Sequence, residues 1–266
     1  MPRARGGSGV IPHEPAPGLR YGAAMTETPT PAQTAAPATP EAAVDDPRAA
    51  LIAGLTRRDT RLHILVLQHP QEQDVQLGTA RLLSGQLNNA THKVGLSWAN
   101  LGKALGRPQV DPKRWAVLHM GAKEDVAKVP RGELAVFGKS GPDPAGNLVL
   151  ADLEGVVLLD GTWSQAKTLW WRNPWLLKLR RIVLHPDFRS AYGSVRKEPR
   201  RESVSTLEAG AFLLGKLEGD PGLQAALLKP FDTLLKQWKS RRGPRRAAAL
   251  GAAAPALGAG EEETEA

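Results

Sequence analysis

The chain has 266 residues, of which 41% are hydrophobic and 23% are charged, and its formal net charge is +8. This composition is ordinary for a soluble globular protein. The chain has no cysteine, which excludes disulfides, thiolate catalysis and any cysteine-ligated zinc or iron–sulfur site, and which fits a cytoplasmic location.

The histidine spacing and the length of the apolar runs argue against a metal site and against a membrane-spanning helix. The six histidines are scattered and include no pair at a metal-binding helical spacing. No apolar run reaches the ~18 residues that a membrane-spanning helix needs. We therefore expect a protein that binds no metal ion and has no membrane partner.

Both ends of the chain differ in composition from the middle. Residues 1–50 hold nine prolines and twelve alanines but few large apolar side chains, so they cannot bury enough surface to offset the entropy of ordering. We predict a disordered leader there, and Met25 stands where a second start codon could lie. From about Ser240 the sequence turns basic, then rich in Ala and Gly, then acidic, which predicts a disordered tail over 241–266. Residues 51–240 suit one domain.

Within this core, short apolar runs of strand length alternate with helical stretches. The expected strands are 62–67, 93–96, 115–118, 134–137, 156–159 and 182–184. The expected helices are 77–88, 98–105, 162–172, 205–218 and 221–239. Such alternation is typical of an α/β fold with a largely parallel sheet covered by helices on both faces.

The fifth expected strand, 156–159, leads straight into an aspartate and a glycine, Asp160 and Gly161. In an open α/β sheet, ligands bind outside the carboxyl ends of the strands, so Asp160 is our first catalytic candidate. On spacing alone, an aspartate that merely occupies a turn or caps a helix is an equally good interpretation.

The helix after this turn is predicted to begin at a capping box. Thr162 and Gln165 have the spacing in which each side chain bonds the backbone N–H of the other. Trp163, Ala166, Trp170 and Trp171 follow at offsets of three, seven and eight, which predicts one helical face beside the strand. The alternative is that the tryptophans are ordinary core residues.

Basic residues are concentrated in one part of the core. From Lys167 to Arg201 there are ten lysine and arginine residues and only two acidic residues, so this stretch alone equals the chain's net charge of +8. It includes Lys167, Arg189 and Arg196. We expect a phosphate-binding surface, and nucleic acid as the partner, rather than an ordinary solvated face. A second basic run, 236–246, is expected to follow RNA without sequence specificity.

A second capping box is predicted at Ser205 and Glu208, after a loop that contains Ser190 and Tyr192. The N-terminus of a helix attracts anions, so Ser205 and Thr206 could hold the anionic end of a cofactor. An ordinary capped helix is the alternative.

Several of these motifs together resemble the DTW-domain family, which is named for an Asp-x-Thr-Trp motif. The resemblance covers most of 60–218 and is carried by Asp160-Gly161-Thr162-Trp163, the Ser190/Tyr192/Arg196 loop, 205–209, His69-Pro70-Gln71-Glu72 and 78–82. It implies a SPOUT-like α/β fold with a C-terminal trefoil knot. It also implies an S-adenosylmethionine-dependent transferase that adds an aminocarboxypropyl group to uridine in tRNA. Many relatives carry an N-terminal cysteine cluster, which this chain lacks.

The resemblance also suggests roles for individual residues. Asp160 would be catalytic, either by accepting the imide proton of uridine or by holding the ammonium of S-adenosylmethionine. The expected donor-binding residues are Thr79, Leu158, Trp163, Ala166, Ser205 and Thr206. The expected substrate-binding residues are Tyr192, Arg196, Arg189 and Lys167. A SPOUT-type RNA methyltransferase and a non-catalytic RNA-binding protein remain alternatives.

Overall fold

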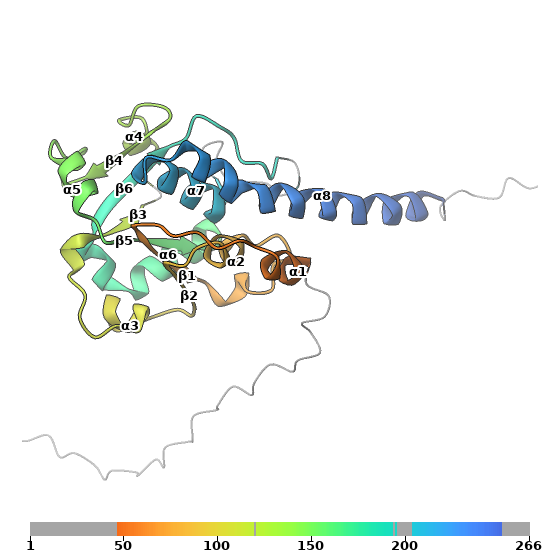
Figure 1. Ribbon diagram of the computed structural model, residues 1–266, viewed down its shortest axis with the longest axis horizontal. Helices are drawn as coiled ribbons and strands as arrows, with labels where there is room; N and C mark the ends of the chain where they lie inside the picture. Colours follow the sequence, from red (N-terminus) through yellow and green to blue (C-terminus); the bar gives the residue numbers. More distant parts are fainter. Residues whose placement is uncertain (1–46, 120, 194, 196–203, 252–266) are drawn as a thin grey trace, which may run out of the picture. The chain divides into compact units, whose positions relative to one another are not determined.

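A six-stranded sheet is the framework of the structure (Figure 1). Its strands are β1 (His63–Gln68), β2 (Ala90–Val94), β3 (Trp115–Leu118), β4 (Glu133–Phe137), β5 (Gly155–Asp160) and β6 (Arg180–His185). They lie in the order β2-β1-β5-β3-β6-β4, and every neighbouring pair is parallel except β4 and β6. The expected α/β class with a largely parallel sheet is therefore confirmed.

The structure is a computed structural model that describes residues 47–119, 121–193, 195 and 204–251. Most of the predicted leader, the end of the predicted tail and Arg196 lie outside these residues. Two described helices cross the expected domain boundaries, because α1 (Pro47–Ala53) begins before residue 50 and α8 (Pro221–Gly251) continues past residue 240. The disorder of the two ends stays a prediction.

The remaining helices fall between or after the strands. They are α2 (Ala80–Gly85), α3 (Leu101–Leu105), α4 (Lys123–Val126), α5 (Gly146–Asp152), α6 (Trp163–Arg172) and α7 (Thr206–Leu217), with 3-10 turns η2 (Pro70–Glu72), η3 (Pro112–Arg114) and η4 (Pro174–Lys178). None of the helices in the described ranges combines the length and hydropathy that a membrane span requires.

Two apolar layers cover the sheet because side chains alternate between its faces along each strand. Ile64 and Val66 of β1 point to the face that packs against α2, α7 and α8. Leu65 and Leu67 point to the opposite face, where α3 and η4 pack. Every residue of β1 is buried, as expected for a strand covered on both sides.

The structure corrects the sequence predictions in several places. β2 begins at Ala90, before the expected 93–96, and α1, α4 and α5 were not predicted. The common face predicted for the α6 residues is wrong for Trp171, which is 75% exposed, whereas Ala166 is buried. At 3.6 residues per turn, an offset of eight leaves Trp171 about 80° from Trp163, on the solvent side of the helix.

Candidate active site

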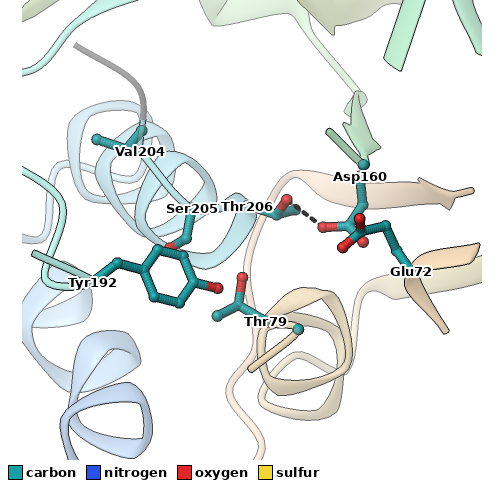
Figure 2. A pocket seen from close by; sticks show the side chains of 9 residues that line it. Glu72, Thr79, Asp160, Tyr192, Val204, Ser205 and Thr206 are labelled. Carbon is teal, nitrogen blue, oxygen red and sulfur yellow. Dashed lines mark hydrogen bonds between the residues drawn. The ribbon is translucent and has the colours of Figure 1, made fainter. Parts of the chain in front are cut away.

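A cavity lies at the carboxyl ends of β1 and β5, where α7 begins (Figure 2). Gln68 and Asp160 are the last residues of these strands and are partners in the parallel register. The residues that line the cavity are Glu72, Gly78, Thr79, Asp160, Gly161, Tyr192, Val204, Ser205 and Thr206. They come from four separate segments of the chain, so the cavity exists only in the folded protein.

Asp160 is a polar side chain of the cavity wall whose two carboxylate oxygens are both hydrogen-bonded. It is 6% exposed. Its Oδ2 accepts a hydrogen bond from Gln68 Nε2 at 2.7 Å, and its Oδ1 accepts one from Thr206 Oγ1 (Figure 2). The Asp160 backbone carbonyl accepts a bond from the His69 amide at 2.9 Å. Donors from β1 and α7 thus fix both oxygens of the carboxylate, and bonds to a charged acceptor are the stronger kind.

The N-terminus of α7 brings Ser205 and Thr206 to the cavity wall. The Ser205 amide donates to Glu208 Oε2 at 2.7 Å and the Glu208 amide donates to Ser205 Oγ at 3.2 Å, which confirms the predicted capping box. Glu208 also accepts bonds from Ser190 Oγ at 2.8 Å and from the Ala191 amide at 2.6 Å. The buried Glu208 carboxylate therefore ties the loop before Tyr192 to the first turn of α7.

Thr79 joins the segment before α2 to α7, and Tyr192 joins the same segment to α8. Thr79 Oγ1 accepts a bond from the Leu207 amide at 3.3 Å. The Tyr192 hydroxyl donates to the Leu77 carbonyl at 2.6 Å, and its ring lies edge-on to Phe231 with centroids 4.9 Å apart. Tyr192 is 2% exposed, so it forms a fixed part of the cavity wall.

The turn between β5 and α6 needs its glycine and its cap. The Thr162 amide donates to Gln165 Oε1 at 2.6 Å and the Gln165 amide donates to Thr162 Oγ1 at 3.4 Å, which confirms the other predicted capping box. A Cβ at Gly161 would stand 2.8 Å from Gln165 Cβ, closer than real carbon atoms approach. Gln165 Nε2 also donates to Gln71 Oε1 at 3.2 Å, so α6 is joined to the segment that carries Glu72.

His92 of β2 is close enough to Asp160 to be affected by its charge. Burial lowers the pKa of His92 below its usual value, the Arg81 guanidinium lowers it further, and Asp160 opposes the shift. No cluster of three or more metal-ligating side chains occurs among the described residues.

Comparison with known families identifies the domain that this chain contains. Residues 47–239, more than half of the chain, match the model of the DTW domain. The chain belongs to the DTW domain family. Its Asp160-Gly161-Thr162-Trp163 motif lies where β5 ends at the cavity and α6 begins.

Individual curated relatives give more specific likenesses. The chain is similar to tRNA-uridine aminocarboxypropyltransferase 2 of Drosophila melanogaster, with 32% identity over 187 residues. It is also similar to the proteins of that name from Macaca fascicularis, with 28% identity over 178 residues, and from Mus musculus, with 27% over 174. Each match covers 65% of this chain, but only 63% of the fly protein and 53% of each mammalian protein. No solved structure matches the chain.

Five of the residues predicted from the sequence meet at the cavity of this DTW domain: Thr79, Asp160, Tyr192, Ser205 and Thr206. The others that the structure describes are not among the residues that line it.

Leu158 and Ala166 are buried, and Arg189 is exposed. Trp163 is half-buried with the exposed Lys167 ammonium 5.8 Å from its ring centroid. The roles expected for these four residues and Lys167 stay predictions, as does that of Arg196, which lies outside the described residues.

The sequence analysis did not select Gln68, Glu72, Gly78, Gly161 or Val204 as site residues. Glu72 and Gly78 stand in motifs that carry the family resemblance, which was a usable signal. Gln68 had no such signal, because its contact with Asp160 depends on the pairing of β1 with β5. That pairing brings together strands that are far apart in the chain.

Proposed function

We propose that this DTW protein transfers the 3-amino-3-carboxypropyl group of S-adenosylmethionine to the ring imide nitrogen of a uridine in tRNA and releases methylthioadenosine. One observation carries the proposal: Asp160 of the DTW motif is buried in a cavity wall and held by Gln68 and Thr206. The names of the curated relatives support the choice of reaction. The SPOUT-like trefoil knot implied by the resemblance is part of the proposal.

The polar lining of the cavity fits the charges of the donor, which carries a sulfonium, an ammonium and a carboxylate. Asp160 and Glu72 bring two carboxylates to the wall, opposite in charge to the two cationic groups (Figure 2). Thr206 gives its hydroxyl hydrogen to Asp160, so its oxygen can accept a bond from an ammonium. The N-terminus of α7, at Ser205 and Thr206, suits the donor's carboxylate because helix N-termini attract anions.

When bound, the donor supplies a carbon activated by the sulfonium: the uridine nitrogen forms a bond to it, and the carbon–sulfur bond breaks with its electron pair going to sulfur. Asp160 either accepts the imide proton or holds the donor's ammonium. A general base contributes typically ~10²–10⁴-fold to a rate. Trp163 and Ala166, on the first turn of α6, would wall the donor so that its propyl chain rather than its methyl group faces the base, which is a positioning effect.

Exposed lysine and arginine side chains in the segment after Asp160 support tRNA as the partner. Side chains on α6, on η4 and on the segment that follows include five exposed cations: Lys167, Arg172, Lys178, Arg180 and Arg189. Such a concentration attracts the phosphates of a nucleic acid and makes the affinity depend on salt.

The test determines which group of the donor, the methyl group or the aminocarboxypropyl group, is transferred to the RNA. Purified protein is incubated with tRNA and with S-adenosylmethionine labelled either in its methyl group or in its aminocarboxypropyl group, and the digested RNA is analysed by nucleoside mass spectrometry. We expect only the aminocarboxypropyl label in uridine, with methylthioadenosine as the by-product. Asp160→Asn should lower the rate by ~10²–10⁴-fold, whereas Asp232→Asn, at an exposed position on α8, should leave it unchanged.

Two outcomes would contradict the proposal and select an alternative. A methyl adduct with release of S-adenosylhomocysteine would identify an RNA methyltransferase. Tight tRNA binding without any adduct would identify a non-catalytic RNA-binding protein.

A further inference from the structure

Helix α6 presents two tryptophans and a lysine along one strip of its surface. Trp163, Lys167 and Trp171 recur every four residues, so each is a surface neighbour of the next, and the row they form is oblique: it turns by about 80° around the helix axis between Trp163 and Trp171. The Lys167 ammonium lies 5.8 Å from the centroid of the Trp163 ring. We call these three residues the α6 strip.

The exposure of Trp171 is unusual for its side chain. Tryptophan buries 150–250 Å² when covered, by the general estimate for aromatic residues, yet Trp171 is 75% exposed. The exposed large hydrophobic residues in the described part of the chain are Val94, Leu148, Trp171 and Leu177. Only Trp171 among them is aromatic, and exposed apolar surface next to polar side chains is typical of a contact site.

The charge of the residues around the strip indicates which class of partner binds there. The ten residues of α6 include Lys167 and Arg172 but no aspartate or glutamate. A second copy of this chain would also be cationic, with its net charge of +8, so self-association here would bring like charges together. A polyanion with flat apolar rings complements both features, and unpaired RNA has this chemistry because its bases stack on aromatic side chains.

The strip starts at the candidate active site. Gly161 lines the cavity, and α6 begins two residues later at Trp163. At 1.5 Å per residue, the eight residues from Trp163 to Trp171 advance about 12 Å along the axis. That length matches about three to four stacked nucleotides at ~3.4 Å each.

We propose that the α6 strip is a stacking platform for unpaired nucleotides of the RNA beside the uridine that enters the cavity. The Trp171 indole stacks on a base, and the Lys167 ammonium pairs with a phosphate. The inference rests on the proposed function for the identity of the RNA, and it adds the surface on which that RNA lies.

The test measures tRNA affinity without turnover, by fluorescence anisotropy of labelled tRNA over a range of salt concentrations. Trp171→Ala should weaken binding about tenfold with an unchanged salt dependence, since stacking carries no charge, and Trp171→Phe should retain most of the affinity. Lys167→Gln should reduce the slope of log K against log salt by about one. Leu148→Ala, at a 76% exposed residue on α5, is the matched control and should bind as the unaltered protein does.

Two results would overturn the inference. One is a Trp171→Ala variant that binds tRNA as tightly as the control does. The other is a change from dimer to monomer in sedimentation with unchanged tRNA affinity, which would make Trp171 a contact between copies. If either result is found and the RNA adduct still forms normally, only the role of the α6 strip is contradicted. If tRNA binding depends on Trp171 but no adduct forms, only the proposed function is contradicted.

Discussion

Gln68 and Asp160 stand opposite each other at the ends of two parallel strands, and the Gln68 amide donates to Asp160 Oδ2 at 2.7 Å. Gln68 is 1% exposed, and its Oε1 has no hydrogen-bond partner among the described residues. A buried carbonyl oxygen without a donor is unfavourable and calls for a reason. The reason here is that turning the NH₂ group toward Asp160 leaves the carbonyl oxygen directed elsewhere.

Replacing Gln68 tests whether the orientation of Asp160 matters for the reaction. Gln68→Leu removes the donor to Asp160 Oδ2, so we expect kcat for aminocarboxypropyl transfer to fall about 10- to 100-fold. The matched control is Gln86→Leu, because the buried Gln86 donates to the Leu82 and Leu227 carbonyls, each at 3.0 Å, and does not line the cavity. The control should lower Tm but keep kcat, and full kcat in Gln68→Leu would show that Asp160 needs no such support.

Local sequence signals predicted the parts of this site that depend on near neighbours. Both capping boxes, at Thr162 and Ser205, are present because their partners are three residues away. Asp160 was predicted because an apolar run ends directly before it.

Long-range features were not predictable in the same way. The contact of Gln68 with Asp160 follows from the strand order, which no single segment encodes. The prediction that Trp171 shares a face with Trp163, Ala166 and Trp170 was wrong. At 3.6 residues per turn, an offset of eight residues exceeds two full turns by about 80°, so Trp171 does not lie above Trp163.

Helix α1 supports the cavity from a distance. Arg48 is 5% exposed, and its guanidinium donates to the Val75 carbonyl at 2.6 Å and the Gln73 carbonyl at 3.4 Å. These carbonyls belong to the segment between Glu72 and Gly78, both of which line the cavity.

We therefore expect Arg48→Met to weaken methylthioadenosine binding in calorimetry about fivefold and to cost about 1.5–3 kcal/mol of unfolding free energy, as for other bonds to charged donors. Arg57→Met, at an exposed arginine close by in the chain, should change neither. Equal ligand affinity in the two variants would show that α1 is no part of the site's support.

The packing of α7 on α2 leaves no room for a side chain at Gly210. A Cβ there would stand 2.4 Å from Leu83 Cδ2, and Leu83 is fully buried. Gly210→Ala should therefore destabilise the fold by about 1–3 kcal/mol through overpacking, seen as a drop in Tm of several degrees. Gly54→Ala, where the new Cβ meets nothing closer than 3.8 Å, should stay within about 1 °C of the unaltered protein, and equal Tm values for both variants would contradict the packing.

Three histidines make the stability depend on pH. Burial is the largest cause that lowers the pKa of His63, His92 and His119 below the usual value of 6.5. A proton then binds the unfolded chain more readily than the folded one, so the stability contributed by these residues is complete above pH 6.5 and is lost as pH falls toward their folded pKa values.

Urea unfolding should give a lower free energy of unfolding at pH 5.5 than at pH 7.5, and His92→Gln should reduce that difference. A free energy of unfolding that is as high at pH 5.5 as at pH 7.5, or higher, would show that the three imidazoles are not held in their neutral form.

Locating the bound donor is the most direct test of the proposed site. A crystal structure of the protein with S-adenosylmethionine and without tRNA should show the donor in the cavity, with its ammonium at Asp160 or Thr206 and its carboxylate at the N-terminus of α7. Donor density outside this cavity, or no density there at saturating concentration, would contradict the assignment of Asp160 to an aminocarboxypropyl transfer site.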